Sequence, residues 1–263
     1  MIPRIIPCLL LADGRLVKTT RFGDPRYVGD PINAVRIFNE KQADELVVLD
    51  ILASVRGTAP DYAAIEEIVS EAFMPVAYGG GITSVEMASR IIQLGVEKVV
   101  VNSAAVERPA LVEEIADRLG SSTLVVGIDA NASTDGRYEV VTRSATKSSG
   151  RRVQDYASAM AAAGAGELLL TSVDRDGTRL GYDLELISRV AGSVSIPVVA
   201  CGGAGHVDDL VRAIREGGAA AAAAGSLFVF RGPQRAVLIT YPSYERRAEL
   251  FEQPPAINGD ASV

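Results

Sequence analysis

The residues Gly79-Gly80-Gly81-Ile82-Thr83 recur half a chain later as Gly202-Gly203-Ala204-Gly205-His206. Each copy follows a short apolar run and precedes a segment with helical periodicity. The apolar runs that end just before Asp50 and Asp174 repeat at nearly the same spacing. This internal repeat predicts a chain built from two related halves.

Apolar runs suited to buried strands occur throughout the sequence. They are Ile5–Leu11, Leu46–Ile51, Met74–Tyr78, Lys98–Asn102, Thr123–Asp129, Glu167–Thr171, Ile196–Cys201 and Ala220–Gly225. The runs are continuous instead of alternating with polar residues, which is typical of parallel strands covered on both faces.

Segments with helical spacing lie between these runs. They are Pro31–Gln42, Pro60–Ala72, Ser84–Leu94, Pro109–Leu119, Arg152–Ala163, Leu184–Ala191, Val207–Glu216 and Pro233–Ile239. Eight strand–helix units predict an α/β fold, a single (β/α)8 TIM barrel over residues 1–240 made of two half-barrel repeats. A doubly wound open sheet is the competing fold. Residues 241–263 are expected to form a C-terminal tail that frays after residue 251.

The amino-acid composition and net charge exclude some classes of protein. The chain has 263 residues, 48% of them apolar, and a net charge of −7. This excludes a disordered chain and argues against nucleic-acid binding, but it permits a small phosphorylated ligand. Neither a signal peptide nor a membrane span is recognisable, so a cytoplasmic protein is expected.

Cysteine and histidine are scarce. The two cysteines, Cys8 and Cys201, exclude a disulfide scaffold, and we expect buried, inert thiols that point into the barrel. The single histidine, His206, excludes a multi-histidine metal site and is expected to cap a helix. We therefore predict no metal and no cofactor.

In such a barrel, functional groups lie at the carboxyl ends of the strands. Two groups of glycine, serine and asparagine residues fall there, one in each half. The first consists of Gly81, Asn102 and Ser103; the second, of Gly177, Gly203, Gly225 and Ser226 with Asp176. Glycine turns let anions approach backbone N–H groups, so the pattern predicts a ligand with two phosphates across the barrel mouth. Tight turns without a ligand are the alternative.

Several side chains at the same end are candidates for chemistry. Asp129 ends the fifth strand and is the best candidate for a general acid or base, although a helix cap is the alternative. Lys18 is predicted to be a mobile cation above an anionic ligand, or else a solvated loop lysine. Asp50 and Thr171 are placed with the ligand-binding residues, and Asp50 is equally suited to capping a turn.

The opposite end carries a second group of charges. Arg4, Glu45, Lys98 and Glu167 lie at or just before strand starts and predict a ring across the N-terminal face. From these residues alone, a stabilising salt-bridge cluster is the favoured interpretation. The internal repeat also marks Leu10, because the strand-end position that holds Asp129 in the second half holds leucine in the first.

Together these motifs resemble the cyclase subunit of imidazole glycerol phosphate synthase over about residues 1–230. The matching segments are RIIPCL (4–9), DGRLVK (13–18), GGGI (79–82), NSAAV (102–106), GID (127–129), SVDRDGT (172–178) and GGAG (202–205). The resemblance implies a (β/α)8 barrel that receives ammonia from a glutaminase docked at its N-terminal face and uses it at the other end on a phosphorylated substrate.

The resemblance also assigns roles to individual residues. It implies that the charged ring of Arg4, Glu45, Lys98 and Glu167 is the ammonia gate. It implies that the glycine-rich groups hold phosphates, and that Asp129 and Lys18 act in catalysis. The family's other catalytic aspartate falls on Leu10, which can neither transfer a proton nor hold a hydroxyl group. Cys201 stands where the family commonly has serine.

A divergent branch of this family resembles the chain more fully. Its members work with sugar-modification systems that convert an N-acetyl group to an acetamidino group in surface polysaccharides. The segments KTTRF (18–22), YVGDPINAVRIFNEK (27–41) and GSLFVF (225–230), the tail segments AVLI (236–239) and YPSYE (241–245), and the PCLLL start at Pro7 carry this likeness. It implies an ammonia-conducting barrel between a glutaminase and an ATP-dependent sugar amidotransferase. The alternatives are a histidine-pathway cyclase that works despite Leu10, and a related phosphoribosyl isomerase without a glutaminase.

Overall fold

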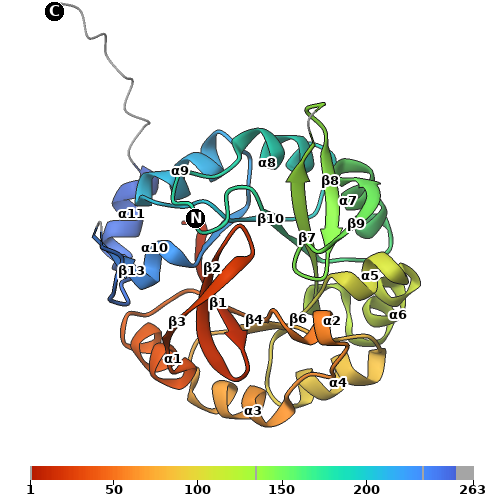
Figure 1. Ribbon diagram of the computed structural model, residues 1–263, viewed down its shortest axis with the longest axis horizontal. Helices are drawn as coiled ribbons and strands as arrows, with labels where there is room; N and C mark the ends of the chain where they lie inside the picture. The colour runs from red at the N-terminus through yellow and green to blue at the C-terminus, as the bar shows by residue number, and fades with distance from the viewer. Residues whose placement is uncertain (1, 134, 233, 253–263) are drawn as a thin grey trace, which may run out of the picture.

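Eight parallel strands close into a barrel in the computed structural model, which describes residues 2–133, 135–232 and 234–252. The strands are β1 (Arg4–Ala12), β4 (Leu46–Asp50), β5 (Val76–Gly79), β6 (Lys98–Val101), β7 (Leu124–Ala132), β10 (Glu167–Ser172), β11 (Val198–Cys201) and β12 (Ala221–Ala224). Pairing of β10 with β7, and of β12 with β1, completes the ring seen end-on in Figure 1. The predicted (β/α)8 fold is confirmed.

Helices surround the strands. They are α1 (Pro31–Glu40), α2 (Ala53–Arg56), α3 (Tyr62–Glu71), α4 (Val85–Gln93), α5 (Ser103–Glu107), α6 (Ala110–Leu119), α7 (Val153–Ala162), α8 (Leu184–Ala191), α9 (Val207–Arg215), α10 (Ser226–Val229) and α11 (Tyr244–Glu252), with a 3-10 turn η1 (Ser121–Thr123). Side-chain caps fix several of their starts, because Asp30, Asp61 and Ser84 accept backbone N–H groups of the first turn.

Two apolar layers follow from the alternation of side chains along each strand. Outward-facing residues pack against the helices and form the large outer core. Inward-facing residues form a separate cluster, which we call the lumen. It consists of Ile6, Cys8, Val47, Ala77, Val100, Val125, Leu169, Val199, Cys201, Ala221 and Ala223. Every described strand of the barrel contributes to this apolar lumen.

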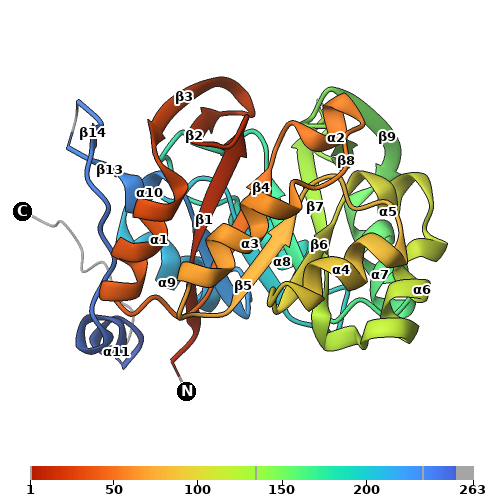
Figure 2. The same cartoon turned by 90° about the horizontal axis from the view of Figure 1, so that it is seen from below.

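Two β-hairpins that the sequence analysis did not predict project from one end of the barrel, drawn at the top of Figure 2. The first is β2 (Arg15–Thr20) with β3 (Gly23–Gly29), and the second is β8 (Tyr138–Thr142) with β9 (Lys147–Arg152). They extend β1 and β7, equivalent strands of the two halves. Their outer strands are largely exposed and polar, so they lack the apolar runs that mark the barrel strands.

The predicted helix Pro233–Ile239 is wrong. Residues 236–237 form β14 (Ala236–Val237), which pairs with β13 (Phe230–Arg231). Backbone N–H groups of Leu238 and Thr240 then bond the carbonyls of Val229 and Phe228, so long-range pairing holds this segment extended.

The chain continues to the N-terminal end of the barrel, where α11 lies at the bottom of Figure 2. The fraying predicted after residue 251 concerns mainly residues 253–263, which lie outside the described residues. Among the helices of the described residues, none is both long and apolar enough to cross a membrane.

Candidate functional site

All the residues predicted for the carboxyl end of the barrel line one cavity at the mouth. They are Leu10, Lys18, Asp50, Gly81, Asn102, Ser103, Asp129, Thr171, Asp176, Gly177, Gly203, Gly225 and Ser226. The cavity, including its open mouth, has a volume of about 1240 Å³. The residues come from loops and strand ends in both halves, so barrel closure brings together groups far apart in sequence.

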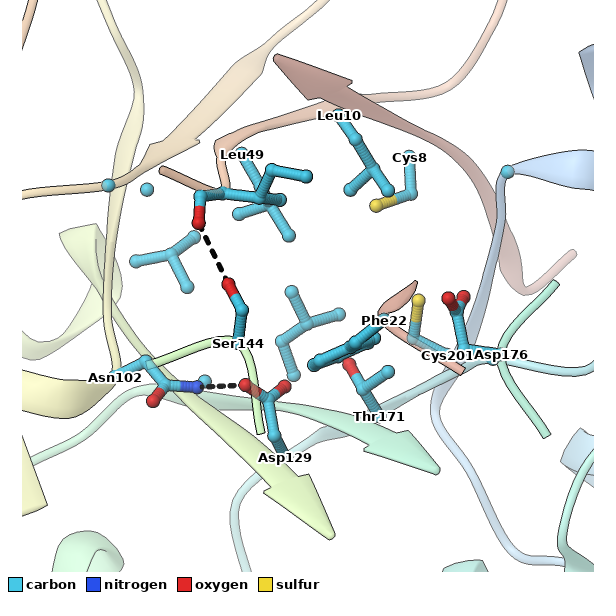
Figure 3. Close-up of a pocket in the computed structure, with 18 of the residues that line it drawn as sticks. Cys8, Leu10, Phe22, Leu49, Asn102, Asp129, Ser144, Thr171, Asp176 and Cys201 are labelled. Carbon is cyan, nitrogen blue, oxygen red and sulfur yellow. Dashed lines mark hydrogen bonds between the residues drawn. The ribbon is translucent and has the colours of Figure 1, made fainter. Parts of the chain in front are cut away.

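Asp129 lies on the wall formed by β7. Its Oδ2 accepts a hydrogen bond from Asn102 Nδ2 at 2.9 Å, and Figure 3 shows both side chains at one side of the cavity. Burial raises the pKa of Asp129 to about 7, against the effect of the Asn102 hydrogen bond. A carboxyl group that titrates near neutral pH is suited to general acid–base chemistry.

Leu10 occupies the wall opposite Asp129 (Figure 3). Together with Leu49 it packs on the upper end of the lumen, so the apolar lining continues into the mouth. The nearest carboxylate in sequence, Asp13, is exposed and paired with Arg56, and it does not line the cavity. The structure therefore offers no acid at Leu10's place from this loop.

Lys18 was predicted to lie in the loop after the first strand, as a mobile cation or as a solvated lysine, and both the loop placement and the solvated alternative are wrong. It is on β2, its side chain is 5% exposed, and Nζ donates to the carbonyl of Cys8. The β2–β3 hairpin folds over the mouth and thus carries Lys18 inward. A Cβ at Gly225 would take the space that Lys18 Nζ occupies, so glycine leaves room for the lysine in this position.

Asp176 faces the same region. Thr19 Oγ1 donates to its Oδ2 at 3.0 Å, and burial raises its pKa while Lys18 lowers it. Asp50 caps a turn, since its Oδ1 accepts the N–H groups of Leu52 and Ala53. Asp50 therefore has the turn-capping role that was the alternative to ligand binding.

The glycines of the mouth have a structural reason to be there. A Cβ at Gly81 would lie 2.5 Å from Thr58 O, and one at Gly203 would collide with Gly181 O. Both also have positive φ, so close packing and backbone conformation already require glycine. Their presence alone therefore does not establish phosphate binding, which stays a prediction.

Phe22 and Ser144 are among the cavity residues that were not predicted from the sequence. They belong to the turns of the two hairpins and both reach into the mouth (Figure 3). Ser144 Oγ donates to Ile51 O at 2.8 Å, and the N–H of Arg143 donates to Ser103 Oγ at 3.0 Å. The hairpins carry no motif for this placement; only their matching positions in the two halves hinted at it.

The two cysteines and the histidine lie as predicted. Cys8 and Cys201 are buried free thiols on the lumen wall. His206 caps α9 and takes part in a reciprocal capping arrangement with Asp209.

The four charges at the other end form a closed ring, which we call the bottom ring. Arg4 pairs with Glu45 and Glu167, and Lys98 Nζ lies 3.0 Å from a carboxylate oxygen of each glutamate. The glutamate side chains are almost fully buried. Each carboxylate thus contacts both cations, and the ring spans the N-terminal end of the lumen as the sequence predicted.

A closed barrel with an apolar lumen, a charged ring below and an aspartate-bearing cavity above defines a HisF-like barrel. The chain belongs to the histidine biosynthesis protein family, which matches residues 4–232. It is of the imidazole glycerol phosphate synthase cyclase type, as its relatives indicate.

Three relatives illustrate the similarity. "Putative imidazole glycerol phosphate synthase subunit HisF" of Leptospira borgpetersenii is 49% identical, over 95% of this chain and 98% of the relative. "Putative imidazole glycerol phosphate synthase subunit hisF2" of Pseudomonas aeruginosa is 49% identical, over 92% and 97%. "Imidazole glycerol phosphate synthase subunit HisF" of Alkaliphilus metalliredigens is 45% identical, over 86% and 89%.

Proposed function

We propose that this barrel is the ammonia-delivering subunit of a glutamine-dependent amidotransferase that converts an N-acetyl group of a sugar to an acetamidino group. A glutaminase docks at the N-terminal face and releases ammonia there. Ammonia passes the bottom ring, follows the lumen and leaves at the mouth. An ATP-dependent sugar amidotransferase activates the amide oxygen, and ammonia displaces it to complete the reaction.

The observation that carries the proposal is the contrast between an intact bottom ring and a mouth in which Leu10 stands at the position of the family's other catalytic aspartate. The ring pairs all four charges at the entrance. At the exit, Leu10 faces Asp129 and extends the apolar lining. Uncharged ammonia passes an apolar lining more readily than ammonium, because burying an unpaired charge is costly. Leu10 thus favours conduction over cyclase chemistry.

A second function, that of a histidine-pathway cyclase, is favoured by a different observation. Asp129 has a pKa of about 7 and a hydrogen bond to Asn102, as a general acid or base requires. Ser103 and Ser226, which are proposed to contact phosphate, line the same cavity. On this alternative, Asp129 works alone and the reaction tolerates Leu10.

A direct assay separates the two functions. The full-length protein receives the ribulosyl-phosphate substrate of the histidine pathway with excess ammonium, and loss of substrate absorbance is followed. We expect no turnover, because a missing acid–base group costs about 10²–10⁴ in rate. Turnover at the rate of an ordinary cyclase contradicts the conduit proposal.

Leu10→Asp sharpens this assay. Restoring a carboxyl group opposite Asp129 is expected to raise cyclase turnover about 100-fold over the wild-type background. Leu10→Asn is the matched control, since it adds a polar group of the same size that cannot transfer a proton. Equal turnover in the two variants would show that the acid at this position is not what the mouth lacks.

The conduit itself is tested by reconstitution with a glutaminase of the imidazole glycerol phosphate synthase type and an ATP-dependent sugar amidotransferase. Glutamine is the only nitrogen source, and mass spectrometry detects replacement of the amide oxygen of an N-acetylated sugar nucleotide by nitrogen. Omitting the barrel is expected to abolish glutamine-dependent product but to leave ammonium-dependent product. Equal glutamine-dependent product without the barrel would contradict the proposal.

A further inference from the structure

The C-terminal helix α11 carries a buried arginine. Arg247 is 4% exposed, whereas the three residues before it, Tyr244, Glu245 and Arg246, are exposed. The helix lies at the N-terminal end of the barrel, the end at which β1 starts (Figure 2). Burying a charge is costly unless the charge is paired and hydrogen-bonded. The proposed function gives Arg247 no role.

Arg247 is held by groups from two segments that are far apart in the chain. Its Nη2 lies 3.1 Å from Oδ1 of Asp44, just before β4, and its Nη1 donates to the carbonyl of Gln42 at 3.3 Å. The guanidinium carbon lies 4.9 Å from the centre of the Tyr241 ring. Tyr241 packs in turn on Phe228, with the ring centres 5.4 Å apart. Arg247 and Tyr241 therefore anchor the C-terminal segment to the loop that holds Asp44.

Asp44 and Tyr241 both bond the backbone at the start of β1. Asp44 Oδ2 accepts the N–H of Ile5 at 3.1 Å, and the Tyr241 hydroxyl donates to the carbonyl of Ile5 at 2.7 Å. The same hydroxyl oxygen accepts the N–H of Asp44 at 3.2 Å. The paired register of β1 with β4 begins only at Cys8 and Val47. Below that point, two side chains satisfy backbone groups of β1 in place of the strand ladder.

We call Asp44, Tyr241 and Arg247 the tail clamp, and it lies beside two members of the bottom ring. Ile5, which the clamp bonds, directly follows Arg4, and Asp44 directly precedes Glu45. Arg4 and Glu45 form an ion pair. The clamp therefore fixes the backbone next to both partners of this pair.

We propose that Tyr241 and Arg247 are positioning residues for the bottom ring. Through the tail clamp they hold Arg4 and Glu45 in the paired geometry that closes this side of the ring against solvent. This role rests on the proposed function, in which ammonia passes the ring. With the clamp in place, ammonia released by the glutaminase enters the lumen. Without it, the Arg4–Glu45 pair loosens and ammonia escapes to solvent before it reaches the lumen.

A double-mutant cycle tests the link between clamp and ring without any ammonia transfer. Urea unfolding of the full-length chain gives the unfolding equilibrium constants of wild type, Arg247→Met, Arg4→Met and the double variant. Because the clamp acts on the ring, we expect the double variant to depart about 10-fold from the product of the two single effects. Additive effects overturn the proposal.

An exposed ion pair provides the control for this cycle. Arg108 pairs with Glu114 at 2.7 Å, and its side chain is 49% exposed. Arg108→Met combined with Arg247→Met is expected to be additive within about twofold, because distant sites without shared partners act independently. The cycle needs no partner protein, so it decides the role of the clamp whether or not the barrel conducts ammonia.

Tyr241→Phe tests the same role by transfer of nitrogen. It keeps the aromatic ring and removes only the hydroxyl group that bonds Ile5. In the reconstituted system of glutaminase, barrel and sugar amidotransferase, the product formed per glutamine hydrolysed is expected to fall about 5-fold. Tyr156→Phe, which removes another buried phenolic hydroxyl on α7 at the other side of the barrel (Figure 1), is the matched control and keeps the wild-type ratio. Circular dichroism confirms that each variant is folded.

The Arg4→Met background separates positioning from a merely structural role. Arg4→Met already opens the ring, so adding Tyr241→Phe is expected to cause no further fall in product per glutamine. A further fall overturns the proposal, because it would show that Tyr241 acts independently of the ring, and so does an unchanged ratio in Tyr241→Phe alone. Lack of glutamine-dependent product with the wild-type barrel contradicts the proposed function instead.

Discussion

The two ends of the barrel differ in how their charged side chains are partnered. In the bottom ring, two cations and two carboxylates, which lie at or just before the starts of four strands, pair with one another. At the mouth, the carboxyl group of Asp129 is buried with an amide partner and faces a leucine across the cavity. Every charge of the bottom ring is paired with an opposite charge of this chain. The buried carboxyl group of Asp129 at the mouth has an amide partner but no paired cation, which is typical of sites that act on another molecule.

This difference has thermodynamic consequences that can be measured at each end. A buried carboxyl group without a paired cation makes the free energy of unfolding depend on pH. In a ring of buried ion pairs, removal of any one charged side chain lowers the free energy of unfolding, because it leaves another charge without its partner. The turn of the β8–β9 hairpin is joined to the mouth by several separate hydrogen bonds, and the loss of any one of them is expected to cost least.

The largest effect is expected from the pH dependence of Asp129. Its pKa is about 7 when folded and near 3.8 when unfolded, so the folded state binds the extra proton between these values. Stability therefore falls as pH rises through this window and is flat above it. Relative to Asp129→Asn, the wild type is expected to lose about 3 kcal/mol of unfolding free energy between pH 5 and pH 8.

Urea unfolding of both proteins at the two pH values gives this difference directly. Asp117→Asn, on the exposed side of α6, is the matched control and keeps the wild-type pH dependence. The same pH dependence in wild type and Asp129→Asn would show that Asp129 ionises normally, and the contrast between the two ends would lose its electrostatic basis.

The next effect concerns the bottom ring. Lys98→Met leaves the nearly buried Glu45 and Glu167 paired, among the described residues, with Arg4 alone. Because Arg4 still pairs with both carboxylates, this change is expected to cost less than the loss of a whole buried pair and to lower the unfolding free energy by about 2 kcal/mol. Urea unfolding at pH 7 measures it.

An exposed ion pair provides the control. Arg36 pairs with Glu71 on the surface, and its side chain is 56% exposed. Arg36→Met is expected to cost less than about 1 kcal/mol. If both variants lose the same amount, the bottom ring is an ordinary surface cluster, not a buried network.

The smallest effect is expected at the hairpin turn over the mouth. Ser144→Ala removes the hydrogen bond to Ile51 O and is expected to cost about 1 kcal/mol. Faster hydrogen exchange in β8 and β9 would report the loosened hairpin. Ser70→Ala, which removes a local bond to Glu67 O on exposed α3, should leave that exchange unchanged. Unchanged exchange in Ser144→Ala as well would mean that the hairpin is held by other contacts.

Much of the barrel was predictable because its signals are local and repeated. Each strand is a continuous apolar run, and seven of the eight predicted helices formed close to their expected positions. The exception, residues 233–239, is held extended by pairing with Val229 and Phe228, which no local pattern records. The polar hairpins escaped prediction for a related reason, since they lack a buried apolar face over most of their length.

The candidate site shows the same division. Strand ends of a parallel barrel meet at one edge, so reading the residue at each strand end was enough to collect Asn102, Asp129 and Thr171 in one cavity. Lys18 was misplaced because its position depends on the fold of a hairpin and on the space left by Gly225. The glycines of the mouth were predicted for phosphate binding, and their requirement for close packing was not predicted.

The sequence by itself determined the eight strand–helix units, the charges at the strand starts and the presence of leucine, not an acid, at position 10. Each of these depends only on residue type and on position along a strand. Only the tertiary structure decided that the pKa of Asp129 is near 7, that Lys18 is buried and that Phe22 and Ser144 reach the cavity. These properties arise from burial and from contacts between residues far apart in the chain, and both exist only once the barrel has closed.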